Sequence, residues 1–157
     1  MPAQSIRTAL RAIGGLVVRK SFSADEDFTA GENLSASQYS FVVPGSVVGE
    51  VKRATGASLP AVFGVLQNAP TTGQKARVRM IGKTLVRAWP AACVLGYGTF
   101  ITVASTGGAC PSGSLPGGPI VGRWVGSAVS TSATLYGEAY VNCMAFPGFT
   151  GCPMSTS

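Results

Sequence analysis

The sequence has no histidine and few charged residues. Its 157 residues include 12 Lys and Arg and 6 Asp and Glu, so charged residues make up only 11% of the chain, whereas an ordinary domain has about 25%. Without histidine, the chain cannot form the triads in which a histidine activates a serine or cysteine nucleophile. The absence of this one residue type therefore excludes a whole class of hydrolytic mechanisms.

Other motifs that carry catalysis or hold cofactors are missing as well. Gly82-Lys83-Thr84 has the last letters of a phosphate-binding loop, but Arg77 stands where that motif requires its upstream glycine. Glu50 and Glu138 occupy solvent-facing positions of predicted strands, whereas glycosidases need two carboxylates facing each other across a cleft. No two cysteines have the CxxC spacing of a zinc site. We therefore predict that the protein is not an enzyme and binds neither a cofactor nor a metal ion.

The sequence also lacks a long hydrophobic run. No run approaches the ~20 apolar residues that span a bilayer, so we expect no membrane association. The N-terminus has an early arginine and a short apolar stretch, as a signal peptide does, but Arg19 and Lys20 close that stretch. The apolar region is at the short limit for a signal peptide, so we do not expect secretion.

The residues that are present favour short strands joined by turns. Hydrophobic residues make up 46% of the chain, with 21 Gly and 10 Pro. Val and Thr favour strands, whereas Gly and Pro favour turns. From residue 33 onward, apolar and polar residues alternate in short segments. The run Ala61 to Leu66 is continuously apolar, as in a strand that is buried on both faces.

These patterns predict an all-β protein, a small β-barrel or sandwich of about seven to eight short strands. We expect an extended N-terminal arm at 1–32, a β-barrel-like domain at 33–146 and an irregular C-terminal tail at 147–157. The acidic segment 24–33 is predicted to be a solvated loop. The Gly-rich segment 105–118 is predicted to be a loop without helix or regular strand.

The clearest candidate binding surface is a strand in which cations and apolar residues alternate. Its apolar side chains are expected to pack inside, because successive side chains of a strand point to opposite faces. Nucleic-acid binding would require interleaved aromatic residues, and only Trp89 is near. A solvated face and an electrostatic docking strip for an acidic protein surface remain open. The inward set is Ala76, Val78 and Met80, and the outward set is Lys75, Arg77 and Arg79.

The N-terminal arm combines cations with apolar residues that have no evident core of their own. Its first part is predicted to form a short amphipathic helix that ends at Gly14-Gly15. The net charge of +6 favours acidic partners. The arm residues that we expect to contact a partner or a neighbouring copy are Arg7, Leu10, Arg11, Ile13 and Leu16.

Four cysteines permit two disulfides with three possible connectivities. They are Cys93, Cys110, Cys143 and Cys152. Cys110 and Cys152 each precede a proline in a Gly-rich loop, which favours stapled loops over core packing. Buried thiols remain the alternative.

Two segments resemble a known family. Residues 33–43, NLSASQYSFVV, and residues 63–80, FGVLQNAPTTGQKARVRM, resemble the opening strand and the core segment of the small capsid decoration, or cement, proteins of tailed bacteriophages. Their order and spacing agree with that family. The later part, including Val121 to Trp124 and Leu135 to Val141, is similar in outline only.

The resemblance implies a compact β-barrel-like protein that is made in the host cytoplasm and binds the outer surface of the virion capsid. Such a protein cements neighbouring major capsid proteins, often as a homotrimer, and binds no nucleic acid. We hypothesise that the basic strand faces an acidic patch on the shell, or the Asp25–Asp27 cluster of a neighbouring copy. In a reducing cytoplasm, any disulfides would form only after lysis.

Two other functions fit the same pattern. The first is another β-rich virion component, such as a tail or head-fibre protein. The second is a secreted β-sandwich binding module stapled by two disulfides. The position on a virus particle would identify the first, and a cleaved N-terminus with oxidised cysteines would identify the second.

Overall fold

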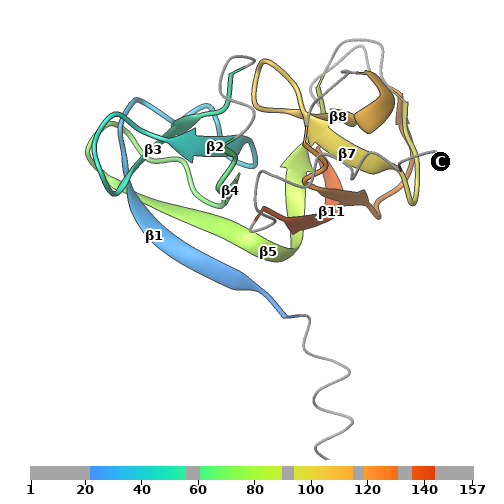
Figure 1. Ribbon diagram of the computed structural model, residues 1–157, viewed down its shortest axis with the longest axis horizontal. Helices are drawn as coiled ribbons and strands as arrows, with labels where there is room; N and C mark the ends of the chain where they lie inside the picture. The colour runs from blue at the N-terminus through green and yellow to red at the C-terminus, as the bar shows by residue number, and fades with distance from the viewer. Residues whose placement is uncertain (1–21, 56–60, 90–93, 115–118, 131–135, 144–157) are drawn as a thin grey trace, which may run out of the picture.

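The computed structural model describes residues 22–55, 61–89, 94–114, 119–130 and 136–143. These residues are built almost entirely of short strands, with one short 3₁₀ helix, η2 (Ser112–Ser114) (Figure 1). The predicted all-β class is therefore confirmed. The strands are β1 (Ala24–Ala30), β2 (Phe41–Pro44), β3 (Glu50–Arg53), β4 (Gly64–Leu66), β5 (Lys75–Arg87), β6 (Val94–Leu95), β7 (Phe100–Val103), β8 (Ala109–Pro111), β9 (Gly122–Trp124), β10 (Val129–Ser130) and β11 (Tyr136–Asn142).

The first half of the molecule is a small closed barrel. Its strands follow the order β1-β3-β2-β4-β5, and β5 pairs back to β1. The β1–β5 pairing is antiparallel and extends from Ala24 opposite Ile81 to Thr29 opposite Lys75. β1 also pairs with β3, in parallel, through Thr29 and Ala30. Closure in this way leaves few exposed strand edges in the barrel.

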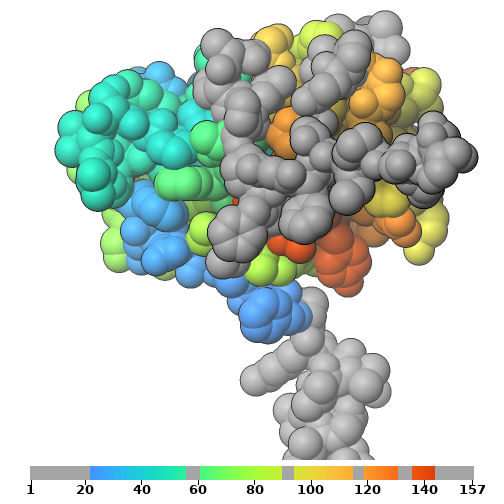
Figure 2. Space-filling model, viewed as in Figure 1, coloured from blue at the N-terminus to red at the C-terminus, as the bar shows by residue number. Residues whose placement is uncertain are grey.

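The second half continues from the other end of β5. Here the order is β5-β11-β9-β7-β8, and a parallel bridge joins Ala88 to Ala109 of β8. A separate pair of two-residue strands, β6 and β10, is also formed. Figure 2 shows the two halves as one continuous surface, with the early strands on one side and the later strands on the other.

The 13-residue strand β5 belongs to both halves. It curves in its middle (Figure 1). Gly82, which lies near the middle of β5, has a φ of +122°. A Cβ atom at this position would lie 2.8 Å from the carbonyl oxygen of Phe22. Only glycine combines this backbone conformation with so close an approach. The backbone conformation of β5 at Gly82 therefore requires a glycine.

The described residues form two main hydrophobic clusters, one inside the barrel and one that spans both halves. In the barrel, Ala76 and Val78 are fully buried, and Met80 packs partly buried against the same cluster. Trp124, in the second half, is the largest fully buried side chain, and its cluster also includes Phe41 of β2 and Val65 of β4. The inward face predicted for β5 is thus confirmed, and the apolar strand β4 is buried along its length.

Two predictions about loops were wrong. The acidic segment was expected to be a loop in the arm, but Ala24–Ala30 forms β1 and closes the barrel. The Gly-rich segment 105–118 was expected to be irregular, but it contains β8 and η2. In both cases pairing with distant strands overrides a local composition typical of loops.

The predicted N-terminal helix lies outside the described residues, and so does the C-terminal tail at 147–157. The same holds for the arm candidates, Arg7, Leu10, Arg11, Ile13 and Leu16. In the part of the chain that the structure describes, no helix has the length and apolarity required to cross a membrane.

Candidate functional site

The three cations of the predicted basic strand face outward, but their partners lie on the same chain. In the β1–β5 pairing, Asp25 stands opposite Arg79 and Asp27 opposite Arg77. Opposite charges directly across two strands attract one another. We refer to these five residues as the charge ladder; they are Asp25, Asp27, Lys75, Arg77 and Arg79.

The pair Arg79–Asp25 is the best-formed contact of the charge ladder. Two guanidinium nitrogens of Arg79 donate to the two carboxylate oxygens of Asp25, at 2.7 and 2.8 Å. A third nitrogen, Nη1, donates to the carbonyl oxygen of Lys83 at 2.8 Å. The Arg79 hydrogen bond holds the pKa of Asp25 below its ordinary value, and the same bond raises the pKa of Arg79. This fork geometry fixes β1 against β5.

The other acid of the ladder, Asp27, is shared by two cations. Lys75 Nζ lies 2.8 Å from one carboxylate oxygen, and Arg77 Nε lies 3.6 Å from the other. The pKa of Asp27 is lowered, chiefly by the hydrogen bond from Lys75. The side chains of Lys75 and Arg77 remain more than half exposed, at 69% and 60%. These contacts are therefore screened by solvent and add little to stability.

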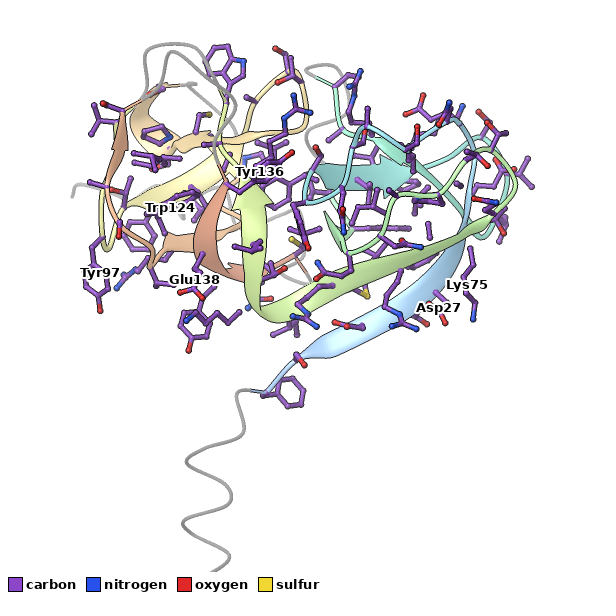
Figure 3. All side chains as sticks on the ribbon, turned by 180° about the vertical axis from the view of Figure 1, so that it is seen from behind. Asp27, Lys75, Tyr97, Trp124, Tyr136 and Glu138 are labelled. Carbon is purple, nitrogen blue, oxygen red and sulfur yellow. The ribbon has the colours of Figure 1, made fainter. Side chains whose placement is uncertain are left out.

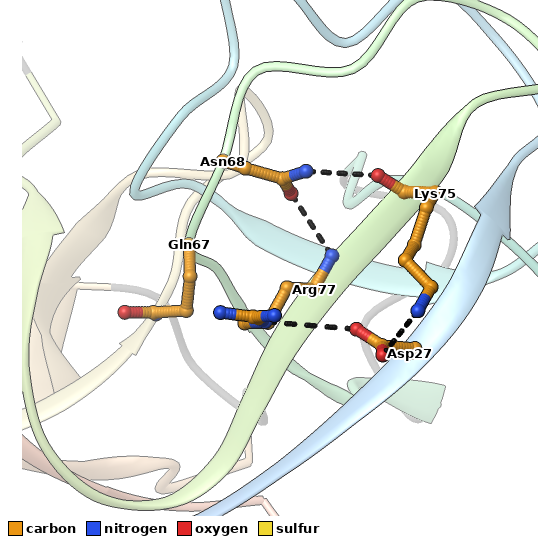
Figure 4. Close-up of a pocket in the computed structure, with 5 residues that line it drawn as sticks. All are labelled: Asp27, Gln67, Asn68, Lys75 and Arg77. Atoms are coloured by element: carbon orange, nitrogen blue, oxygen red, sulfur yellow. Dashed lines mark hydrogen bonds and ion pairs between the residues drawn. The ribbon is translucent and has the colours of Figure 1, made fainter.

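A small polar hollow opens beside Asp27 (Figure 4). Asn68 lines the hollow and fixes the adjoining part of β5, because its Oδ1 accepts a hydrogen bond from the Arg77 backbone N–H and its Nδ2 donates to the Lys75 carbonyl oxygen. Gln67 completes the lining. The hollow combines two cations with one acid, so one positive charge is left unbalanced among its lining residues.

The charge ladder corrects the hypothesis that Asp25 and Asp27 would bind the basic strand of a neighbouring copy. These acids lie beside that strand in their own chain, where they help to close the barrel. The sequence showed both the acidic and the basic cluster. Their pairing was missed because the acidic segment was predicted to be a loop rather than a strand. The outward face of Lys75, Arg77 and Arg79 is present as predicted, although it is already partly neutralised.

A second surface was not predicted. It is the outer face of the second half, where residues of four strands stand side by side in register. Phe100 is opposite Arg123, Arg123 is opposite Tyr140, and Tyr140 is opposite Lys83. We call these four residues the aromatic row. The outward alternation of Tyr136, Glu138 and Tyr140 in the sequence was the one available signal for it.

The described cysteines are packed in different clusters. Cys110 is buried beside Ala104 and Trp89, whereas Cys143 packs against the Trp124 cluster. The two do not form a disulfide with one another. Burial raises the pKa of the Cys143 thiol to about 12. Cys93 and Cys152 lie outside the described residues, so the predicted disulfides are not tested.

No group of three or more Cys, Asp or Glu side chains that could hold a metal ion is found among the described residues. The comparisons with known proteins show similarity in fold rather than in sequence. No protein-family model matches the sequence, and no curated protein matches it. The structure is similar to the N base of the head fiber protein gp8.5 of bacteriophage phi29, with a TM-score of 0.54 and 17% identity. The match covers 78% of this chain and 96% of that chain.

This similarity establishes a shared fold. Nearly the whole of the head-fiber N base has a counterpart here, so the agreement is not limited to one hairpin.

Proposed function

We propose that the protein is a β-rich structural component of a phage virion, attached to the outer surface of the head as the base of a head fibre is. The observation that carries this proposal is the fold match, which covers 96% of the phi29 head-fiber N base. A fibre base must present a rigid domain to the head, and a closed barrel with a shared strand provides one. The proposed partner is the major capsid protein, and the proposed role is structural rather than enzymatic.

A second candidate, capsid cementing, is supported by the sequence resemblance. The segment 63–80 that resembles the decoration proteins spans β4, the following turn and the first half of β5. These strands form the barrel wall beside the charge ladder. A cement protein would contact several capsid subunits at once, commonly as a trimer, and would gain strength from its many copies on one shell.

The test uses heads from a phage that lacks the gene for this chain. Purified protein is mixed with these heads and the heads are sedimented. The number of bound copies per copy of the major capsid protein is then measured. We expect saturable binding at a fixed ratio, and electron microscopy of the particles should show the added density on the head. Density on the tail, or no binding by folded protein, would overturn the proposal.

A thermal stability measurement on the same heads distinguishes the fibre-base function from capsid cementing. A cement protein bridges neighbouring capsid subunits at many sites, so its binding should clearly raise the temperature at which heads break open. A fibre base that occupies fewer sites and bridges no subunits should raise that temperature much less.

A further inference from the structure

The aromatic row forms a continuous outward stripe across four strands. Phe100 in β7, Arg123 in β9, Tyr140 in β11 and Lys83 in β5 are directly opposite neighbours, so their side chains share one face of the sheet. On the other face Val141 is buried in the core. The row therefore belongs to the surface of the second half.

Arg123 is the distinctive member of the row. Its guanidinium lies over the Phe100 ring, 4.4 Å from the centroid, where the negative face of the ring attracts it. Arg123 is exposed and has no acidic partner among the described residues. By contrast, Lys83 is paired with Glu138 at 2.7 Å. Arg123 is thus a pre-oriented cation whose hydrogen-bond donors face solvent.

The surroundings of Arg123 are unusually apolar for an exposed surface. Phe100 is 47% exposed and Tyr140 is 49% exposed. Tyr97 is 83% exposed and points outward on the same side as Glu138 (Figure 3). Exposed aromatic side chains grouped around an arginine are the composition of the energetically dominant part of a protein–protein interface.

We propose that the aromatic row is a docking surface for an acidic patch on another protein, with a partner carboxylate seated on Arg123 and apolar partner groups on Phe100 and Tyr140. The proposal rests on the proposed function, in which that protein belongs to the phage head. Charge complementarity selects this occupant. A nucleic acid would require several unpaired cations along the row, but Lys83 is neutralised by Glu138 and only Arg123 lacks a described acidic partner.

The test measures binding of purified variants to heads that lack this chain. We expect Arg123→Ala and Phe100→Ala each to raise the dissociation constant about ten- to thirtyfold. Arg53→Ala is the matched control, because Arg53 is an exposed arginine on β3 in the other half whose side chain forms no ion pair with a described residue. Its backbone N–H donates to Glu32, and the substitution leaves that hydrogen bond in place. It should change binding less than about threefold. Urea unfolding should show that all three variants remain folded.

The dependence of binding on salt distinguishes the charge contribution of Arg123 from the apolar contribution of Phe100. The difference between wild type and Arg123→Ala should shrink as NaCl is raised from about 0.1 M to about 0.5 M, because salt weakens the attraction between the Arg123 guanidinium and the partner carboxylate. The difference for Phe100→Ala should persist.

Wild-type protein that does not bind heads would overturn the proposed function, and the named partner with it. Wild-type binding with unchanged Arg123→Ala and Phe100→Ala variants would overturn this inference alone. Sedimentation of the free protein tests whether the aromatic row binds a second copy of this chain instead. Self-association of the wild type that is lost in Arg123→Ala would show such binding and would contradict an acidic partner on the head.

Discussion

At the scale of single residues, the second half depends on a close contact between Trp124 and Gly137. Trp124 is fully buried, and its Nε1–H donates to the carbonyl oxygen of Ser127 at 2.9 Å. The indole lies over the backbone of Gly137, where an added Cβ would be 2.1 Å from its Cζ2 atom. The fixed indole cannot move away without losing its hydrogen bond. Gly137 is therefore required by packing rather than by backbone conformation.

Gly137→Ala should lower the free energy of unfolding by about 1–3 kcal/mol, because it overpacks a rigid core. Urea denaturation followed by tryptophan fluorescence measures this loss. Gly113→Ala is the matched control, since an added Cβ at Gly113 meets nothing within 4 Å, and should cost less than about 0.5 kcal/mol. Equal losses for the two variants would contradict the packing argument.

Cys143 should react very slowly with thiol reagents in the folded protein. Its pKa of about 12, against an ordinary value of 9.0, reduces the thiolate fraction near pH 8 about a thousandfold. Mass spectrometry after brief treatment with iodoacetamide should find Cys143 unmodified in native protein and modified in urea. Rapid modification of native protein would show that this thiol is more accessible than its packing indicates.

At the scale of elements, β1 is held to β5 by charge as well as by the backbone. Asp25 and Arg79 are each less than a third exposed, with side-chain exposures of 30% and 24%. Asp27 and Lys75, with 39% and 69%, lie further into solvent. The Asp25–Arg79 pair is therefore the member of the ladder that contributes measurably to stability, because solvent screens it least.

Asp25→Asn should lower the free energy of unfolding by about 1 kcal/mol at pH 7. The pKa of Asp25 is lowered in the folded state, so the pair contributes fully above the ordinary carboxyl pKa of 3.8. This contribution is lost as the pH falls through the lower folded-state pKa. Urea denaturation of both proteins from pH 7 to pH 2.5 should show the two stabilities converging in acid.

Asp27→Asn serves as the comparison for Asp25→Asn. It removes the same charge from the same strand at a more exposed position, so its effect should be smaller and more sensitive to salt. A stability difference for Asp25→Asn that stays constant down to pH 2.5 would rule out the carboxylate as its source.

At the scale of the whole molecule, β5 couples the two halves. Its first part pairs with β1 and β4 in the barrel, and its second part pairs with β11. A strand shared in this way cannot lose its pairing in one half without disturbing the other. We therefore expect the two halves to unfold as one cooperative unit.

Hydrogen exchange tests this coupling. Gly137→Ala, although it lies in β11, should reduce the protection of slowly exchanging β1–β5 amides by the same factor as that of β11 amides. A loss of protection confined to β7, β9 and β11 would show that the halves open independently.

Much of the fold could be predicted from the sequence because strand periodicity is local. Alternation alone placed Ala76 and Val78 inside and Arg77 outside, since successive side chains of any strand point to opposite faces. The apolar run Ala61 to Leu66 was predicted as a buried strand; this is correct for Gly64–Leu66, whereas Ala61 is exposed and lies outside the strand. The candidate site was predicted only in part: the basic face of β5 was recognised, but its partners and the aromatic row were not.

What the sequence by itself determined is therefore the all-β class, the inward and outward faces of the long basic strand and the lack of a histidine-based catalytic group. Only the tertiary structure decided which charges are neutralised and which stay available. Asp25 meets Arg79 across 54 positions of sequence, and Arg123 meets Phe100 because β9 pairs with β7. The physical reason is that side-chain direction follows from the local backbone, whereas strand register is fixed by closing a barrel and burying two cores.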